Sequence, residues 1–535
     1  MADFQNPHFI FHSETDAPGG VMQLIDHNQD IFLNFGPNVR NNHELARQRG
    51  SLYGLPYATA LPEILRAGLL PPLSNLYGNF PGRPQTINQL ADLMRSSSRI
   101  ESSLIERQIK LAKETASIEH QGVLLTHGHE DAFGGVHFLK PSIPIVASQE
   151  TLQTIRLKED LSTQHKDEFF EVKRRDLPKV GRSYQTEERT VLTAGYKEEF
   201  ALGEFSRNVL HKVDHMLGAS AAEIIMPNNG PRVVFTLDMG VGSNTEHFIE
   251  STWGSGDVDL LVLDSTAIGG ERQYNEPRTS FRIALEEKVY AYPQSNAFVE
   301  IPQRHIQRLV NLIEVAQKTK RKVYVPIDMA YYAKTLLPQS MQNSFKIYLP
   351  QRESRTYSPS DYPAILGEIA FSENGDRNPD VLTIEELVSE VQGEKGFVVM
   401  DNHNHLMQMV NSGDVSHRKV RNSSTSKVDQ FQNIFISAGY NYRTQLTAKA
   451  DMDAADNAGL VYKEILLTDH TPEPIMQEYL LAMTSGIILT VHTSNPEGAR
   501  RFVKRIQPNA VIPTISRSGI YEIIGGQKGI KRIEI

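Results

Sequence analysis

The chain has 535 residues, and its 55 Lys plus Arg residues are outnumbered by 64 Asp plus Glu residues, which gives a formal charge of −9. Hydrophobic residues make up 39% of it, a share typical of globular proteins that excludes a disordered or collagen-like chain. At roughly 150 residues per domain, the length allows about three to four domains or one elaborated α/β architecture. A net acidic chain binds nucleic acid only through a local basic channel.

Cysteine is absent from the sequence. Disulfides, iron–sulfur clusters, thiolate zinc sites and a cysteine nucleophile are therefore excluded. Any metal must be held by carboxylates and by the 18 histidines. The beginning of the chain lacks the basic and apolar regions of a signal peptide, and no uncharged apolar run approaches the roughly 18 residues of a membrane span. We expect a cytoplasmic protein that does not associate with membranes.

Predicted elements in residues 1–265 are mostly short β-strands separated by turns. Two apolar runs around an Asp-His-Asn-Gln turn predict a β-hairpin over 21–36. Four later apolar runs predict buried strands, and the last two carry an aspartate near the carboxyl end: 118–126, 143–148, 232–238 and 258–266.

A different pattern follows in the second half of the chain. Apolar residues at helical spacing after a proline predict a helix over 302–318, and 322–326 predicts the next strand. Such helix–strand alternation is typical of a parallel α/β sheet. The polar, basic and serine-rich segment 411–427 predicts an exposed loop. Near the end we expect a further strand–helix–strand unit over 486–494, 496–506 and 509–515.

The segment LLTHGHEDAFGG, residues 124–135, carries the most informative pattern. His127, His129 and Asp131 alternate directly after a predicted buried strand, so on an extended backbone their side chains point the same way. Imidazole and carboxylate are the ligands that suit zinc when thiolates are absent. The glycine pair at 134–135 permits a sharp turn into a helix. The sequence therefore predicts a metal site here.

The motif resembles the signature of the metallo-β-lactamase fold, and within it that of the ribonuclease J-like β-CASP nucleases. Segments that follow in the expected order agree: VDHMLGAS with His215, VVFTLDMG with Asp238, LLVLDST with Asp264, and VHTSNPEGARRF with His492. The resemblance implies an α/β fold, an αββα sandwich interrupted by a parallel α/β β-CASP domain. The implied domains are 1–265 and 446–535 for the two parts of the lactamase fold, and 266–445 for the insertion.

The resemblance also implies a ligand set. The first metal would be held by His127, His129 and His215, with Asp238 as a fourth or bridging ligand. The second metal would take Asp131, the residue after it, and a histidine from a final IPxH segment. The residue after Asp131 is alanine, and 512–515 reads IPTI, so both imidazoles of that metal are missing from these positions. We expect one zinc ion per chain, with Asp131 and Asp238 as the catalytic carboxylates.

Further departures affect the implied substrate site. Where the family has HTSGHA, this chain has His-Thr-Ser from His492 onward, followed by Asn-Pro. Gln307 stands at the position that resembles another expected histidine, and His305 lies close by. Asn34 stands where the family usually has an aspartate. The predicted substrate contacts are Asp264, Arg304, Arg308 and His492. The basic segments 320–322 and 418–427 are interpreted as a phosphate channel or, equally, as solvated surface. The histidines at 402–405 and at 469–470 are interpreted as ordinary loop residues.

Three functions remain open from the sequence. The first is a ribonuclease J-like hydrolase that acts on or binds RNA, with impaired two-metal activity. The second is an inactive pseudo-nuclease that serves as a partner subunit, since the resemblance implies homo- or hetero-oligomers. The third is a hydrolase of a small ester or nucleotide with a single metal.

Overall fold

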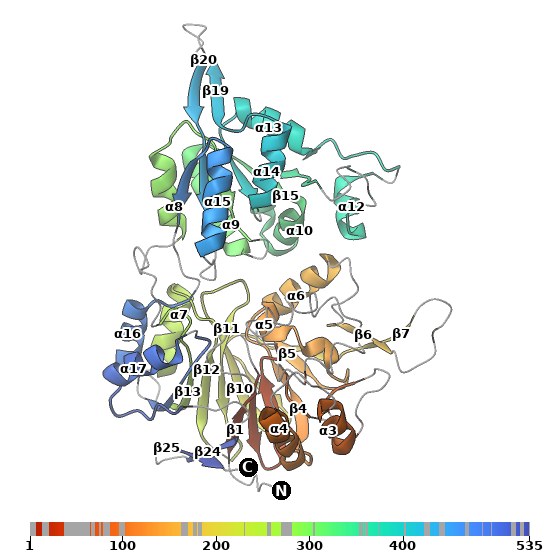
Figure 1. The fold of residues 1–535 in the computed structure, drawn as a ribbon, viewed down its shortest axis with the longest axis vertical. Helices are drawn as coiled ribbons and strands as arrows, with labels where there is room; N and C mark the ends of the chain where they lie inside the picture. Colours follow the sequence, from red (N-terminus) through yellow and green to blue (C-terminus); the bar gives the residue numbers. More distant parts are fainter. Residues whose placement is uncertain are drawn as a thin grey trace. The chain divides into compact units, whose positions relative to one another are not determined.

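The structure is a computed structural model, and it describes these residues: 7–12, 21–36, 65, 70–73, 76–78, 86–95, 102–161, 169–174, 179, 184–228, 230–253, 258–268, 281–302, 305–351, 357, 359, 362–372, 374–400, 403–421, 428–437, 445–465, 470–483, 485–493, 495–514, 520–524 and 529–533. The chain forms two compact units (Figure 1). The first contains 1–156, 164–272 and 470–535, and the second contains 157–163 and 273–469. The sequence boundary at 445/446 thus falls inside the second unit.

The first unit contains an eight-stranded sheet that joins both ends of the chain. Antiparallel pairing of β2 with β3 confirms the hairpin expected over 21–36. The strand order is β25 (Gly529–Ile533), β24 (Ile520–Ile524), β1 (His8–Phe11), β2 (Met22–Asp26), β3 (Gln29–Leu33), β4 (Glu119–Leu124), β5 (Ile145–Ala147) and β8 (Val191–Thr193).

A six-stranded sheet forms the other half of this unit. Its strand order is β23 (Ser485–Val491), β13 (Val258–Asp264), β12 (Arg232–Thr236), β11 (Ser220–Ile225), β10 (Phe205–Lys212) and β9 (Glu199–Leu202). β12, β13 and β23 pair in parallel, so their carboxyl ends lie at the same edge. A separate ribbon pairs β6 (Glu171–Arg174) with β7 (Gln185–Glu188).

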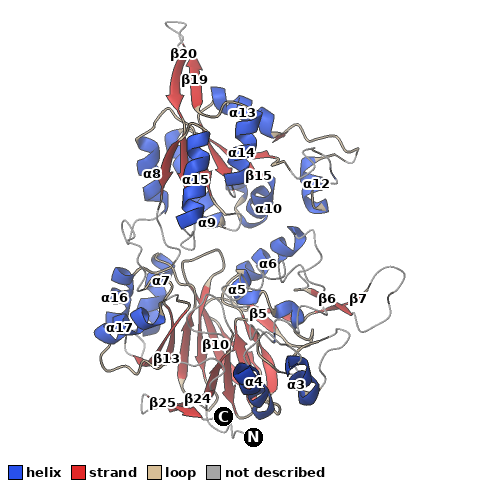
Figure 2. Ribbon diagram, viewed as in Figure 1, coloured by secondary structure: helices blue, strands red, loops and turns tan. Residues whose placement is uncertain are grey.

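Buried apolar residues arrange the first unit as four layers, α–β–β–α. One core lies between the sheets and joins residues such as Leu24 and Leu124 to Ile224 and Val262. The outer face of the eight-stranded sheet packs against α3 (Ile87–Arg95), α4 (Ser102–Glu114) and α6 (Gln149–Leu161). The outer face of the other sheet packs against α7 (Ser243–Phe248), α16 (Glu473–Leu481) and α17 (Pro496–Ile506). Figure 2 shows the strands between these two sets of helices.

The second unit is built on a parallel seven-stranded sheet. Its strand order is β17 (Val381–Leu382), β16 (Lys346–Tyr348), β15 (Lys322–Pro326), β18 (Gly396–Met400), β14 (Ala297–Glu300), β21 (Ile434–Ser437) and β22 (Val461–Glu464). Its helices are α8 (Phe281–Tyr290), α9 (Ile306–Thr319), α10 (Ile327–Leu336), α11 (Gln339–Gln342), α12 (Ala364–Ala370), α13 (Ile384–Gly393), α14 (His403–Ser412) and α15 (Gln445–Asn457).

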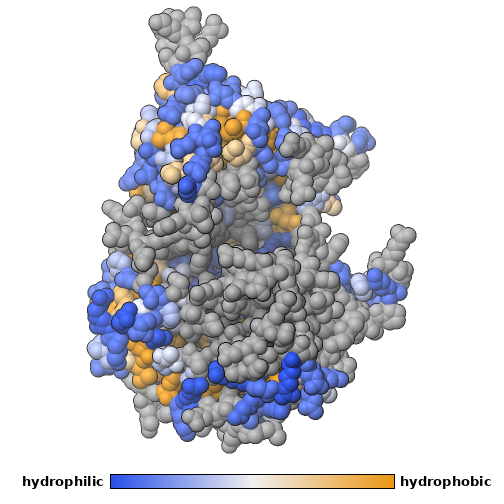
Figure 3. Space-filling view, viewed as in Figure 1, coloured by the Kyte–Doolittle hydropathy of each residue, from blue (hydrophilic) through white to orange (hydrophobic). Residues whose placement is uncertain are grey.

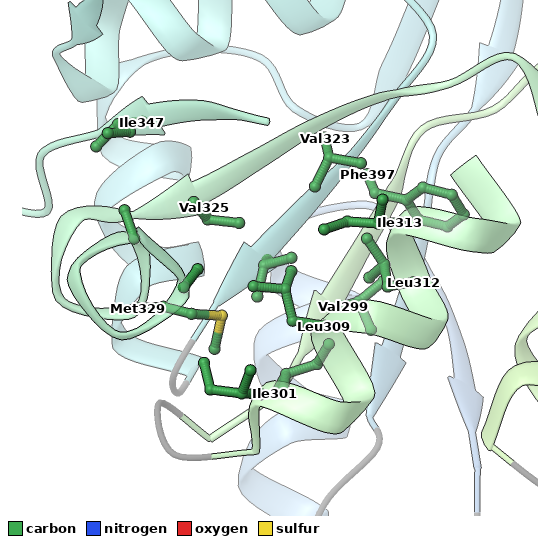
Figure 4. Close-up of a cluster of buried hydrophobic side chains, with 14 of the residues drawn as sticks. Val299, Ile301, Leu309, Leu312, Ile313, Val323, Val325, Met329, Ile347 and Phe397 are labelled. Atoms are coloured by element: carbon green, nitrogen blue, oxygen red, sulfur yellow. The ribbon is translucent and has the colours of Figure 1, made fainter. Parts of the chain in front are cut away.

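Helix α9 shows how this sheet is covered. Its apolar residues recur at helical spacing, so Leu309, Leu312 and Ile313 all reach the core. There they pack with sheet residues that include Val299 and Val323 (Figure 4). The helix predicted over 302–318 begins at Ile306 and the strand expected over 322–326 is β15.

Two expected elements differ from the structure. The segment 411–427 is not only a loop, because β19 (His417–Arg421) pairs with β20 (Val428–Gln432) in an antiparallel ribbon. A two-stranded ribbon has no buried face of its own, so the apolar pattern used to recognise strands is missing from it. The strand expected over 509–515 is reduced to a single bridge from Val511 to Ile487. Pro513 lacks the N–H group that a longer ladder needs.

Among the described residues, no helix is both long and apolar enough to cross a membrane.

Candidate metal centre

Histidines and aspartates from several loops of the first unit meet at one edge of the sandwich. Asp264 is the last residue of β13. Asp238 lies two residues after the end of β12, and His492 directly follows β23. His215 follows β10, and His470 precedes α16. Because β12, β13 and β23 are parallel neighbours, the residues at their carboxyl ends come together even though they are distant in the sequence.

The motif residues lie in a loop and a short helix that follow β4. His127 lies in the loop, His129 is the N-cap of α5 (Glu130–Phe133), and Asp131 lies in the first turn of that helix. The expected alternation on an extended segment is therefore wrong, since His127 and Asp131 approach each other at helical spacing, with 3.8 Å between Nε2 and Oδ1. Neither glycine of the 134–135 pair has a positive φ. Gly135 is needed for close packing, because a Cβ there would lie 2.9 Å from the Phe35 carbonyl oxygen. The next turn is a 3₁₀ helix, Val136–Phe138.

Four residues converge on one point: His127, His129, His215 and Asp238, each with a ligand atom within 4.8 Å of the others. His127 Nε2 lies 2.9 Å and His215 Nε2 lies 3.5 Å from Asp238 Oδ2. The three rings are nearly perpendicular to one another, with centroids 4.9 to 5.3 Å apart. The structure thus brings together the complete ligand set expected for the first metal.

A second group shares Asp238 with the first: Asp238, Asp264, His470 and His492, all buried and again within 4.8 Å of one another. His492 Nδ1 lies 3.0 Å from Asp238 Oδ1, and its Nε2 lies 3.3 Å from Asp131 Oδ2. The histidines expected after Asp131 and in the final IPxH segment are absent, but the imidazole of His492 lies on this side of the centre. His492 reaches the centre because β23 runs parallel beside β13.

Two further residues of the centre were missed at the sequence level. His470, interpreted as an ordinary loop histidine, lies with Nδ1 2.7 Å from Asp264 Oδ2. Thr266 donates to Asp264 Oδ1 at 2.7 Å, and the same hydroxyl oxygen lies 2.6 Å from His492 Nδ1. The sequence signals for these two residues are weak. They are the Asp-His dipeptide at 469–470 and a threonine two residues after Asp264, near the carboxyl end of a predicted strand.

Unusual backbone conformations hold the centre. Asp238 and His492 each have φ of 60°, and Asn34 has φ of 56°, in the left-handed region that residues other than glycine adopt rarely. Such conformations persist where the surrounding structure imposes them. Asn34 Oδ1 accepts hydrogen bonds from the backbone N–H and hydroxyl of Thr126, at 2.9 and 3.1 Å. The Thr126 hydroxyl oxygen in turn lies 3.0 Å from His127 Nδ1, so Asn34 orients the loop that carries this ligand.

The electrostatics of the centre suit cation binding. Burial acts to raise the pKa of Asp131, but the hydrogen bond and charge of His492 and the charge of His127 outweigh it and lower the pKa to about 2. Burial lowers the pKa of His215 to about 3 despite the opposing charge of Asp238. Asp131 is therefore a carboxylate and His215 is neutral at ordinary pH, and these are the protonation states of metal ligands.

The chemistry of the donors also fits a metal. Among the described residues, His127 Nε2 and Asp238 Oδ1 are buried and form no hydrogen bond of normal geometry. They lie beside other ligand atoms instead, His127 Nε2 at 2.9 Å from Asp238 Oδ2 and Asp238 Oδ1 at 3.0 Å from His492 Nδ1, so a cation bound between them would take up their lone pairs. Three imidazoles and a carboxylate form a set typical of zinc sites. The residues present therefore fit a metal ion.

The other predicted substrate contacts are placed differently. Arg308 lies in the second unit, is buried, and holds its guanidinium 5.6 Å from the centre of the Phe281 ring. Arg304 falls outside the described residues. Gln307 is exposed on α9, and His305 is buried as the N-cap of that helix. The proposed substrate contacts of the two arginines remain predictions.

No family model matches the chain, and a search of curated proteins finds no match. Among solved structures, the chain is similar to a protein of unknown function from Enterococcus faecalis V583, with 14% identity and a TM-score of 0.63 over 96% of this chain and 99% of that one. Zn²⁺-bound PqqB from Methylobacterium extorquens matches 48% of this chain and 73% of its own, with 12% identity and a TM-score of 0.25. The metallo-β-lactamase fold protein YhfI from Bacillus subtilis matches 49% and 72%, with 11% identity and a TM-score of 0.24. The fold of the whole chain is therefore shared with the Enterococcus protein.

Proposed function

We propose that this chain is a metal-dependent hydrolase of the metallo-β-lactamase type that cleaves phosphodiester bonds of RNA. The observation that carries the proposal is that Asp238 is shared between three imidazoles on one side, those of His127, His129 and His215, and the His492 imidazole with the Asp131 carboxylate on the other. Two ions held by a shared carboxylate are the usual arrangement for in-line displacement at phosphorus. RNA as the substrate follows from the motif resemblance and from the α/β unit inserted before His470.

The residues divide between two candidate ion positions. His127, His129, His215 and Asp238 would hold the first ion. His492 with Asp131 and Asp238 would hold the second. When bound, such ions polarise the phosphoryl group and lower the pKa of a coordinated water. Ala132 offers no ligand at its position, so we expect the second ion to be held less tightly than the first.

His470 is placed to move a proton. Its Nδ1 lies 2.7 Å from Asp264 Oδ2, and Asp264 also accepts from the backbone N–H of Met239 at 3.0 Å, which keeps the carboxylate oriented. Burial acts to lower the pKa of His470, but the charge and hydrogen bond of Asp264 outweigh it, so the pKa is raised. A histidine that retains its proton near neutral pH can protonate the leaving oxygen of a cleaved ester. We assign His470 this role, with Asp264 as its positioning residue.

The alternative is the inactive partner subunit. The histidine absent after Asp131 favours it, whereas the buried imidazoles of His470 and His492 count against it. The two proposals differ in metal content and in turnover.

Both quantities can be measured on the same preparations. Protein purified without added metal is analysed for metal content and then incubated with single-stranded RNA, single-stranded DNA and a simple phosphodiester, with and without a chelator. We expect RNA cleavage that the chelator abolishes, and a loss of at least about a hundredfold in the His129→Ala and His492→Ala variants. His470→Ala should reduce cleavage while its metal content stays unchanged. A protein that binds metal but turns over none of the substrates would overturn the proposal in favour of the inactive subunit.

A further inference from the structure

A group of cationic side chains lies at the amino-terminal edge of the sheet in the second unit. Lys320 and Arg321 directly precede β15, Lys395 directly precedes β18, and Arg418 lies in β19. β15 and β18 are parallel neighbours that begin side by side, with Lys322 opposite Gly396. The Lys322 N–H also donates to the Lys395 carbonyl at 2.9 Å. We call these residues the basic cluster: Lys320, Arg321, Lys395 and Arg418.

Two guanidinium groups of the basic cluster meet at one turn, residues 292–295. Arg321 is only 7% exposed and donates to the carbonyl oxygens of Tyr292, at 2.9 Å, and Ser295. Arg418 donates to the adjacent carbonyl of Gln294 at 3.0 Å and to its Oε1 at 3.4 Å. The Nε atoms of both arginines are buried, and within the described part of the chain neither has a hydrogen-bond partner. Each arginine therefore keeps a free donor inside the cluster.

Carboxylates balance these charges only in part, since the charge of Glu394 acts to raise the pKa of Arg418 but burial outweighs it. The two nearby glutamates are engaged by other lysines: Glu390 by Lys346 at 2.6 Å and by Lys322 at 3.5 Å, and Glu394 by Lys322 at 3.1 Å. No described carboxylate forms an ion pair with any member of the basic cluster. Burial, together with the charge of Arg418, lowers the pKa of Arg321 to about 10. Burial also lowers the pKa of Lys395, and the charges of Arg321, Arg418 and Lys320 lower it further.

A buried guanidinium without a counter-charge is unfavourable, and like charges around it add to the cost. The carbonyl groups of the 292–295 turn satisfy part of the hydrogen-bonding capacity of the arginines, but they carry no net charge. An anion bound at the cluster would provide the missing charge. Among anions, phosphate oxygens match the fork of donors on arginine.

We propose that the basic cluster binds the sugar–phosphate backbone of a single-stranded nucleic acid. The adjoining strand β19 reads HRKVR, so cationic residues continue along the chain from Arg418. The β19–β20 hairpin extends beyond the helices of its unit, and the described surface at its base is mainly hydrophilic (Figures 1 and 3). An extended polyanion can contact the exposed Lys320 and the half-buried Lys395 and Arg418 together with the strand that continues from Arg418. Only the class of ligand rests on the proposed nuclease function, since the uncompensated charge is a property of the second unit alone.

The test separates binding from cleavage. Binding of a fluorescently labelled single-stranded RNA to the full chain is measured by anisotropy over a series of salt concentrations, with a chelator present to prevent hydrolysis. We expect Arg418→Gln and Lys395→Gln each to weaken binding by about three- to tenfold and to reduce the slope of log Kd against log salt by about 1. Arg418→Lys, which keeps the charge but loses the fork, should fall between Arg418→Gln and the unchanged protein.

Lys334→Gln is the matched control, because it removes an exposed lysine of the same unit from α10, which follows the opposite end of β15. It should leave the Kd unchanged. Equal Kd values for Lys334→Gln and the cluster variants would overturn the proposal, provided that all variants melt like the unchanged protein. Stabilisation by inorganic phosphate without RNA binding would show a small-anion site and would also overturn it. His129→Ala should abolish cleavage while binding is retained, so failure of the nuclease function is distinguishable.

Discussion

Asp238 links the two halves of the metal centre through different oxygens. Oδ2 lies nearest His127 and His215, whereas Oδ1 lies 3.0 Å from His492. Asp238 lies two residues after β12 and has a φ of 60°. Loss of this one side chain should therefore affect both ions, whereas loss of a peripheral ligand should affect only one.

The expected result concerns metal content. Asp238→Asn should reduce bound metal to well below one ion per chain, because the neutral amide supplies neither the charge nor the second oxygen ligand. Asp131→Asn should leave about one ion, since the imidazoles of His127, His129 and His215 are untouched. Elemental analysis of dialysed protein measures both. Equal losses in the two variants would contradict the division into two positions.

Asn34 acts on the centre without approaching the metal position itself. Its Oδ1 holds Thr126, which contacts His127, and its backbone adopts a left-handed conformation that asparagine tolerates better than most residues. Asn34→Asp keeps the acceptor, and we expect nearly unchanged metal affinity. Asn34→Ala removes it, and metal affinity should fall by about 10- to 100-fold. Titration of metal-free protein with zinc compares the two variants, and equal affinities would show that the contact has no positioning role.

The individual ligands were predictable to different extents. His127, His129, His215 and Asp238 follow from local motifs, and the structure brings all of them together. His492 reaches the metal ligands because β23 pairs with β13, and His470 reaches them because the neighbouring Thr471 donates to the Met239 carbonyl; both contacts join residues more than two hundred positions apart.

At the level of elements, the short helix α5 is fixed by close packing against the segment after β3. The Phe35 N–H donates to the Ala132 carbonyl, and Gly36 lies so close that a Cβ there would be 1.8 Å from the Asp131 carbonyl oxygen. Because that neighbour is backbone, no rotamer change can relieve the clash. The position of Asp131 therefore depends on a glycine in another element.

Gly36→Ala should displace α5 and lower the free energy of unfolding by about 1–3 kcal/mol. It should also weaken the second ion more than the first, because Asp131 moves with the helix. Gly393→Ala is the matched control, since a Cβ at this position in α13 meets nothing within 4 Å. Helix propensity then predicts a gain of up to about 1 kcal/mol. Urea unfolding distinguishes the two, and a neutral effect of Gly36→Ala would contradict the packing argument.

The predicted elements succeeded where burial imposes a pattern. The hairpin over 21–36 and the strand over 322–326 were recognised because their apolar residues face a core. β19 was missed because a ribbon outside the main sheet has no such face. The single bridge at Val511 shows the opposite error, since an apolar run alone does not secure a partner strand.

At the scale of the whole chain, the first unit is assembled from both ends of the sequence. β24 pairs with β1, and β23 pairs with β13, while 273–469 forms the second unit. The order of motifs predicted an interrupted fold of this kind. The return placed at residue 446 lies within the second unit, because β22 pairs in parallel with β21 of that unit's sheet.

Metal removal should consequently act on one unit only. All candidate ligands belong to the first unit, so a bound ion stabilises that unit by mass action, by about 2.7 kcal/mol when free zinc is 100 times its Kd. For a unit of this size we expect a chelator to lower its melting temperature by about 4 °C. The second unit has its own core and no ligand in either group, so the melting temperature of its transition should not change.

Differential scanning calorimetry resolves the two unfolding transitions. His129→Ala is the control variant, since the transition of its first unit should no longer respond to the chelator. A shift of both transitions by the same amount would show that the two units unfold together, because only coupled unfolding transmits the loss of the ion to the second unit.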